Sequence, residues 1–283
     1  MTRRGFLVLL AACALLVAAS LVSLVREDDL SLGRKPWQNL QQSASEMARP
    51  SFLDIWFGNP HLEYRSDDGR VLRTEDRRAE ERSFIAALAA ACWTTVRIAT
   101  LGSLLGALLA LPFALLTARN LAAPRWLAFP AAFTLNVARA IHTLVFGLFF
   151  VGIIGLGATA GILAIAAHSM GSFGKLYAES IESLDMASID AVRATGASPL
   201  QTFFNAVWPA VLPQFVSNTL YLWEFNIRDS TVLGLVGAGG LGLLISEAMG
   251  LFQWPRLATI LIAVIAMVVL IDTASRRIRQ ALL

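Results

Sequence analysis

Long apolar runs without charge constrain this chain more than any other feature. Its 283 residues include 43 charged ones, of which 22 lie between positions 26 and 82, so the other 226 residues share only 21. Charged residues make up 15% of the chain and hydrophobic residues 56%, with a mean hydropathy of +0.62. In a soluble domain about a quarter of the residues are charged. We therefore expect an all-α integral membrane protein and exclude a soluble enzyme with one buried core.

The apolar runs predict about six membrane spans, because a hydrocarbon core about 30 Å thick takes about 20 helical residues. We interpret the first run as a retained anchor, residues 1–25. A cleaved signal peptide, the alternative, would have a shorter apolar core of about 7–15 residues. In the second run, Gly102 and Gly106 have the spacing that lets two helices approach closely. The expected runs are 5–25, 83–118, 126–154, 157–170, 209–227 and 256–273.

The charged stretch is too polar for lipid, so residues 26–83 are expected to form an insert outside the membrane. Between positions 26 and 82 it holds 10 basic and 12 acidic residues. Residues 51–57 lie between two prolines and have the composition of a short interfacial helix, with Trp56 suited to the headgroup layer. A partly ordered loop is the alternative. The charges of the insert suit contact with another protein.

Basic residues in the short segments predict the orientation. If six spans are counted, they all fall on one side, which the positive-inside rule assigns to the cytoplasm. Both termini are then cytoplasmic, and the insert faces outward, since long loops largely escape the rule. The residues concerned are Arg3, Arg4, Arg119, Arg125, Lys175, Arg193, Arg276, Arg277 and Arg279.

Other classes of site find little support in the sequence. The net charge is +3, but the basic residues are dispersed or interleaved with acids, so we expect no nucleic-acid partner. Three histidines far apart lack the spacing of metal ligands, and we predict no metal. Both cysteines lie in apolar runs and are expected to pack rather than to form a disulfide.

Residues 173–208, between the fourth and fifth spans, form the segment that we expect to carry the function. The stretch 177–195 has helical character, with Glu179, Glu182 and Asp185 on its polar side. Gly196 stands where a left-handed residue would end that helix. Ser198 can cap the next helix and Pro199 can open it, so we expect a second helix running to about position 207.

This segment resembles a known motif. Asp190-Ala191-Val192, three residues, Gly196, nine residues and then Ala206-Val207-Trp208-Pro209 are similar to the EAA loop of the permease subunits of binding-protein-dependent ABC importers. The family pattern is E-A-A, three residues, G, nine residues, I-x-L-P. Ala191, Gly196 and Pro209 match it and Asp190 stands in for Glu, whereas Val192, Ala206 and Trp208 depart.

The surrounding sequence narrows the resemblance to the phosphonate transport permeases, over about residues 84–283. It is carried by strings in the family's order and spacing. They are GKLYAESIE from Gly174, ATGAS from Ala194, Leu220-Tyr221, EFNIR from Glu224 and LGLVGAGGLG from Leu233. The resemblance implies a type I ABC importer permease fold, with 84–283 as the transmembrane domain, 1–25 as an anchor and 26–83 as an outer insert.

The resemblance also implies a mechanism. A short cytoplasmic helix, about residues 187–194, would dock into a groove on a separate ATPase subunit and transmit its closure to the spans. Small residues permit close backbone approach, and acidic ones can pair with basic residues of the partner. The expected coupling residues are Glu179, Glu182, Asp190, Ala191, Arg193, Gly196, Ser198, Pro199 and Pro209.

The chain itself is not expected to hydrolyse ATP, because it contains no phosphate-binding G-x-x-x-x-G-K-[ST] sequence. We expect it to bind no cofactor, with ATP and Mg held by the partner ATPase. The run from Gly237 through Gly239 and Gly240 superficially resembles a dinucleotide-binding fingerprint. It lacks the preceding strand and the distant acidic partner, so a flexible or close-packed membrane turn, and a candidate gate, is the better interpretation.

Charges within apolar spans are costly, about 2.5–3.5 kcal/mol each, and invite a functional hypothesis. Glu224 and Arg228 are four residues apart and can neutralise each other. We interpret the pair first as structural, fixing the outer end of the fifth span, and keep a role in the gate or path as the alternative. Arg139 either lines a path for an oxyanion, which paired guanidinium donors suit, or reaches the interface. For Arg97 we prefer the interpretation that its side chain extends to the outer membrane–water interface.

We therefore expect an inner-membrane permease subunit of an ATP-driven importer for phosphonate, phosphite or a related phosphorus oxyanion. It would act as a homodimer with two ATPase subunits and an outer solute-binding protein. An importer of another small solute such as methionine is the alternative. A secondary transporter would need more intramembrane carboxylates, and a membrane enzyme would need a clustered constellation that the sequence does not show.

Overall fold

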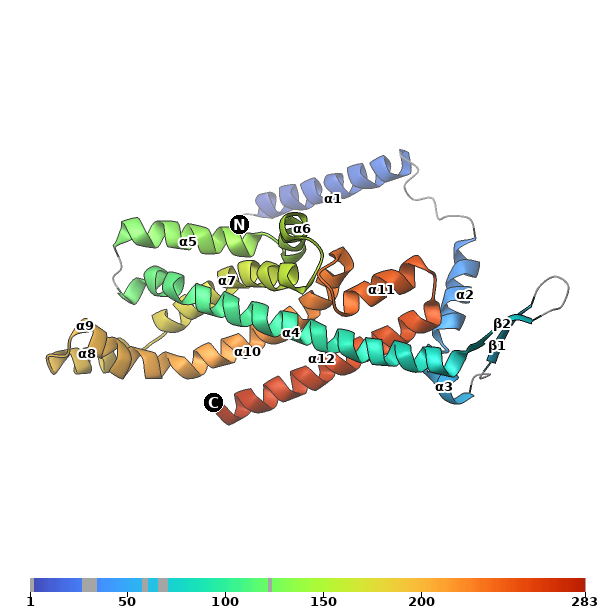
Figure 1. Ribbon diagram of the computed structural model, residues 1–283. Coiled ribbons are helices and arrows are strands. Elements are labelled where there is room, and N and C mark those ends of the chain that lie inside the picture. The colour runs from blue at the N-terminus through green and yellow to red at the C-terminus, as the bar shows by residue number, and fades with distance from the viewer. Residues whose placement is uncertain (1–2, 27–34, 58–60, 66–70, 122–123, 283) are drawn as a thin grey trace. The chain divides into compact units, whose positions relative to one another are not determined.

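The computed structural model describes residues 3–26, 35–57, 61–65, 71–121 and 124–282, which Figure 1 colours along the chain. Parts of the expected insert lie outside these residues. The chain divides into two compact units, residues 1–46 and 47–283. The first unit holds α1 (Arg3–Arg26), and α2 (Pro36–Met47) begins in it. In α1 the stretch Gly5–Ser23 is long and apolar enough to cross a membrane.

The second unit begins with the short helical segments η1 (Ser51–Leu53) and α3 (Asp54–Phe57), so a helix does form in this part of the insert. An antiparallel hairpin follows, β1 (His61–Arg65) and β2 (Val71–Asp76), which the sequence analysis does not anticipate. Next comes α4 (Arg77–Thr117), 41 residues long. Asp76 caps it by accepting hydrogen bonds from the N–H groups of residues 78 and 79, so the helix starts six residues before the expected position 83.

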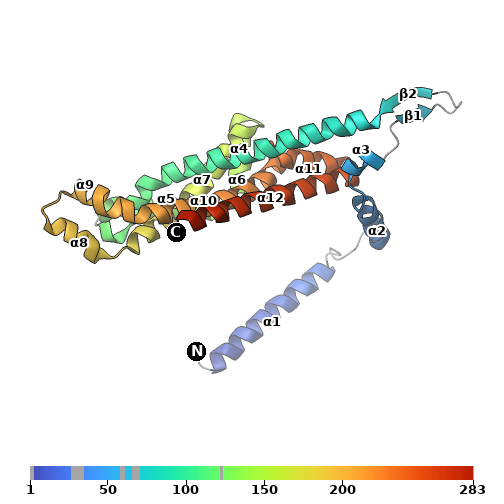
Figure 2. The same cartoon turned by 90° about the horizontal axis from the view of Figure 1, so that it is seen from below.

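Eleven further elements complete the described part of this unit. They are η2 (Arg119–Leu121), α5 (Arg125–Ala140), α6 (Thr143–Ile154), α7 (Ala158–Glu182), α8 (Met186–Ala194), α9 (Pro199–Thr202), the π-helical turn η3 (Phe203–Val207), α10 (Trp208–Leu233), α11 (Leu241–Gly250) and α12 (Trp254–Leu282), with a 3₁₀ turn η4 (Gly234–Val236) before α11. Figures 1 and 2 show α8 and α9 at one end of this helical unit and α3 with the hairpin at the other.

The central helix is α7, which packs against α4, α5, α6 and α10. More than half of its 25 residues are buried, many of them alanine, glycine or serine. Opposite it, a Cβ at Gly102 would lie 2.7 Å from the Cβ of Ile165, and a Cβ at Gly106 would lie 3.0 Å from a backbone oxygen of α7. The spacing of these two glycines therefore correctly predicts a close helix contact.

Two segments that were predicted as continuous helices are each divided into two helices in the structure. The run 126–154, predicted as one span, is broken into α5 and α6, which meet at 91°. Ile141 and His142 leave the helical conformation, and the Nδ1 of His142 accepts a hydrogen bond from the N–H of Leu144 to begin α6. The stretch 177–195 is likewise two helices, because α7 ends at Glu182 and Asp185 caps α8.

Several helices have the length and composition of membrane spans. Among the residues that the structure describes, three qualify alone, within α1, α4 and α12, and up to five qualify if each bent pair counts as one span. The bent pairs are α5 with α6 and the segment 199–236 with α11. The expected fourth span, 157–170, lies in α7, which continues to Glu182 and is not among these candidates. The count of six therefore stays a prediction.

The insert is attached to the transmembrane helices. The hydroxyls of Ser51 and Thr259 on α12 lie 3.0 Å apart. The guanidinium of Arg256 on α12 forms ion pairs of 2.6 Å with Glu80 and 3.2 Å with Glu81 on α4. These contacts join η1, α4 and α12 at the end of the unit that carries the hairpin (Figure 2).

Candidate functional site

The expected coupling segment forms a helix, a turn and a second helix at one end of the unit. Helix α8 is nine residues long and closely matches the expected residues 187–194. One of its side chains, Ile189, is buried, whereas Asp190, Ala191 and Arg193 are exposed. The helix is thus anchored on one face and open on the other, as a docking element requires.

The turn between α8 and α9 follows local rules that the sequence predicts. Gly196 has φ +84°, a left-handed conformation that glycine adopts without strain. The Ser198 hydroxyl accepts from the N–H of Gln201, and the Gln201 side chain accepts from the N–H of Ser198, which completes a capping box. Pro199 is the first helical residue. The α8–α9 angle is therefore set by three neighbouring residues.

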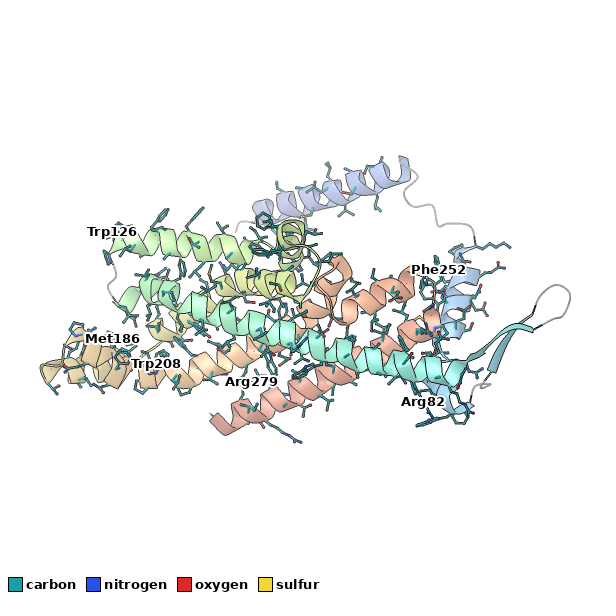
Figure 3. The ribbon with its side chains drawn as sticks, in the orientation of Figure 1. Arg82, Trp126, Met186, Trp208, Phe252 and Arg279 are labelled. Atoms are coloured by element: carbon teal, nitrogen blue, oxygen red, sulfur yellow. The ribbon has the colours of Figure 1, made fainter. Side chains whose placement is uncertain are left out.

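The π-helical turn η3 and Pro209 lie where the coupling segment joins α10. The second helix therefore does not run regularly to position 207 as expected, because α9 ends at Thr202 and the backbone widens before Trp208. The Trp208 ring meets Phe215 edge-on at 6.2 Å, and Phe215 stacks on Tyr177 of α7 at 4.2 Å. Figure 3 labels Trp208 at this junction. An aromatic stack thus joins the coupling segment to the central helix.

The four charged residues expected at the coupling surface are already engaged within the chain. Asp190 pairs with Arg193 on α8 at 3.2 Å, and Glu179 pairs with Lys175 on α7 at 3.2 Å. Glu182 accepts a hydrogen bond of 2.9 Å from the backbone N–H of Arg119, in the connector after α4. The surface that α8, α9 and the start of η3 leave open is mostly uncharged and includes Ala187, Ala191, Ala194, Leu200 and Phe204.

Polar side chains missed by the sequence analysis line a cavity of about 410 Å³ between α7 and α10. The amide of Asn218 donates to the Ser180 hydroxyl at 3.0 Å and accepts from Gln214 at 3.3 Å. The carboxylate of Glu179 also lines this cavity, so its walls combine hydroxyl, amide and carboxylate groups that can hydrogen-bond a polar solute. Gln214 and Asn218 are four residues apart on α10 and Ser180 is 38 residues away on α7, so these residues give no distinctive sequence signal.

The three glycines expected to form a gate or close-packed turn lie together. Gly237, Gly239 and Gly240 have φ of +93°, +87° and +73°. The Thr95 hydroxyl on α4 accepts from the N–H of Leu241 at 2.9 Å, and a Cβ at Gly240 would lie 2.4 Å from it. The turn is therefore packed directly against α4.

The pair formed by Glu224 and Arg228 is present, but it belongs to a larger cluster. Arg279, near the end of α12, lies 3.5 Å from the second carboxylate oxygen of Glu224. The Glu224 side chain is buried, and the two guanidinium groups approach it from α10 and α12. Figure 3 labels Arg279 beside α10. The cluster therefore joins two helices, whereas the expected role was to fix the end of one.

The remaining candidate cations lie apart from these groups. Arg139 is exposed on α5, and its Nε donates to the side-chain oxygen of Asn136 at 3.2 Å. Arg97 is exposed on α4. Within the described residues, no hydrogen bond or ion pair joins Arg139 to Glu224, to Arg228 or to the glycine turn.

The arrangement of helices is that of a known class of membrane subunit. A chain of the MetNI methionine ABC transporter, solved in inward-facing conformations, superposes with a TM-score of 0.63 at 21% identity, covering 71% of this chain and 98% of that chain. This likeness shows the fold, that of type I ABC importer permeases.

The sequence then identifies the family. Residues 110–283 match the family described as the binding-protein-dependent transport system inner membrane component, and the chain belongs to this family. It is therefore a multi-pass inner-membrane transport subunit rather than an enzyme, and membership implies an ATPase and a binding protein as partners.

Two relatives are similar over about two thirds of this chain. A phosphite transport system permease protein of Stutzerimonas stutzeri, PtxC, is 41% identical over 187 residues, 66% of this chain and 68% of the relative. A phosphate-import permease protein of Mycolicibacterium smegmatis, PhnE, is 37% identical over 188 residues, 66% of this chain and 35% of the relative.

Proposed function

We propose that this chain forms, as a homodimer, the translocation pathway of an ATP-driven importer of phosphorus oxyanions such as phosphite, phosphate or phosphonate. The observation that carries the solute class is 37–41% identity to permeases named for phosphite and phosphate transport. The likeness to the methionine transporter is 21% identical and supports the fold alone.

The exposed face of α8 and α9 supports the coupling part of the proposal. Its open residues are small or apolar, and its charged residues 190 and 193 pair with each other. Docking would therefore bury apolar surface and backbone on a groove of the ATPase rather than form new ion pairs. Two copies of the chain would present two such helices to two ATPase subunits, which hold ATP and Mg.

In this proposal α8 and α9 face the cytoplasm, both termini are cytoplasmic, and the insert faces the binding protein. Arg139, Glu224, Arg228 and the glycine turn at 237–240 remain candidates for the path or gate. ATP would favour the outward-open state, and hydrolysis with product release would restore the inward-open state. In both states α8 and α9 would stay joined by the same turn.

The experiment is ATP hydrolysis by the complete complex of this chain, its ATPase and its binding protein in lipid nanodiscs. Phosphite, phosphate, phosphonate and methionine are compared as stimulants. We expect a phosphorus oxyanion to raise hydrolysis several-fold and methionine to leave it unchanged. Gly196→Val is expected to abolish the stimulation, because a β-branched residue is strongly disfavoured at φ +84°.

Each outcome is informative. Stimulation by methionine alone would retain the importer and reject the proposed solute. If no ATPase copurifies and uptake instead follows an ion gradient, the chain acts as a secondary transporter. Stimulation that persists unchanged in Gly196→Val, with the complex intact, would contradict the assignment of the coupling turn.

A further inference from the structure

The connector after α4 is bonded to the end of the central helix. The backbone N–H of Arg119 donates to Glu182 at 2.9 Å, and its guanidinium Nε lies 3.9 Å from the same carboxylate oxygen. The Asn120 amide donates to the carbonyl of Ile181 at 2.6 Å and lies 3.8 Å from the sulfur of Met186. We name this set of five residues the connector clasp.

The clasp bridges a break in the helical backbone. Helix α7 ends at Glu182 and α8 begins at Met186, with Asp185 in an extended conformation between them. Asn120 contacts Ile181 before the break and Met186 after it. Asn120 therefore contacts both α7 and α8, so its contacts depend on the position of α8 relative to α7. Figure 3 labels Met186 at this point.

The negative charge of Glu182 lies at an unfavourable position, the C-terminus of α7. A carboxylate at the C-terminus of a helix faces the negative end of the helix dipole, which is unfavourable. Glu182 occupies the last position of α7, where the N–H and guanidinium of Arg119 compensate it. Glu179, one turn earlier, pairs with Lys175 of the same helix and contacts no other element through this pair.

We propose that the connector clasp is a second mechanical link from the coupling helix to the membrane, with Glu182 and Asn120 as positioning residues. The covalent chain joins α8 only to α7 and, through α9 and η3, to α10. The clasp adds the connector η2, which follows α4 and leads to α5. Movement of α8 on the ATPase is thereby transmitted to four helices of the unit, α7, α10, α4 and α5. This inference rests on the proposed function.

The test measures the number of phosphite ions transported per ATP hydrolysed, in proteoliposomes that contain the complete complex with its ATPase and binding protein. Glu182→Ala and Asn120→Ala each remove one half of the clasp. Glu182→Gln keeps an oxygen that can accept from the N–H of Arg119. Asp272→Ala is the matched control, since it removes a carboxylate whose ion pair, with Arg276, lies within one helix, α12, away from the clasp.

We expect Glu182→Ala and Asn120→Ala to lower the ratio at least fivefold while ATP hydrolysis and copurification are retained. Glu182→Gln should stay within twofold of the wild type, as should Asp272→Ala. A purely structural role would change yield or melting temperature but not this ratio.

The inference is overturned if both alanine variants at positions 182 and 120 keep the wild-type ratio, or if Asp272→Ala lowers it as much as they do. It is also overturned if neither alanine variant assembles, because the clasp would then serve folding. If the wild-type complex itself shows no ATP-driven phosphite transport, the proposed function has failed rather than the clasp.

Discussion

Single residues determine how closely the helices of this protein approach one another, and Gly240 is the clearest case. Its φ of +73° lies in the left-handed region, and the space that a Cβ would need is occupied by the hydroxyl of the fully buried Thr95. That hydroxyl also accepts from the N–H of Leu241 and donates to the carbonyl of Ala91. The glycine turn is therefore held by hydrogen bonds that a side chain would displace.

Gly240→Ala is accordingly expected to lower the stability by ~2–5 kcal/mol, the sum of left-handed strain and overpacking. The melting temperature of the purified protein in detergent measures this loss. Gly152→Ala in α6 is the control, because a Cβ there meets nothing within 4 Å. Equal melting temperatures of the two variants would show that the glycine turn accommodates a side chain at position 240 without loss of stability.

At the scale of elements, an electrostatic cluster links α10 and α12. The buried carboxylate of Glu224 is shared by Arg228 on its own helix and Arg279 on α12. A buried carboxylate is tolerated only with such partners, and losing it leaves two cations facing each other. On α12 itself, Asp272 pairs with Arg276 within one helix and is more exposed.

Glu224→Gln should therefore destabilise the protein by about 3 kcal/mol or more, since breaking a buried pair costs ~3–5 kcal/mol. Asp272→Asn should cost only ~0–1 kcal/mol, as partly exposed pairs do. Both variants remove one negative charge, so thermal unfolding in the same detergent compares them directly. A larger loss in Asp272→Asn would refute the role of the cluster in joining α10 to α12.

For the whole molecule, the larger unit has two structurally different ends. The coupling segment lies at one end of the larger unit, and the helical part of the insert, attached to α12 through Ser51 and Thr259, lies at the other (Figure 2). Trp56 in the insert is 74% exposed and Leu200 in α9 is 68% exposed. If the chain spans the membrane as proposed, these two side chains face opposite compartments.

A labelling experiment tests this orientation. In a chain whose two cysteines, Cys13 and Cys92, are replaced by serine, a membrane-impermeant maleimide should label Trp56→Cys in intact cells. Leu200→Cys should be labelled only after permeabilisation. Labelling of both positions in intact cells, or the reverse pattern, would contradict the proposed topology.

Local rules explain what the sequence determines by itself. Runs of apolar residues predict a helical membrane protein because each span must bury its own backbone hydrogen bonds. Gly196, Ser198 and Pro199 predict the turn between α8 and α9 because cap chemistry depends only on neighbouring residues. Gly102 and Gly106 predict the close contact of α4 with α7 because small residues at that spacing leave room for a second helix.

Only the tertiary structure shows how these pieces are joined. The 91° break at Ile141 and His142 occurs without a proline or glycine, so no local signal marks it. From the sequence alone, Glu182 is expected to be an exposed carboxylate available to a partner protein. In the structure it accepts a hydrogen bond from the backbone N–H of Arg119, 63 positions away. Arg279 reaches Glu224 across 55 positions. Such contacts depend on which faces of distant helices meet, and that is decided only when the whole chain packs.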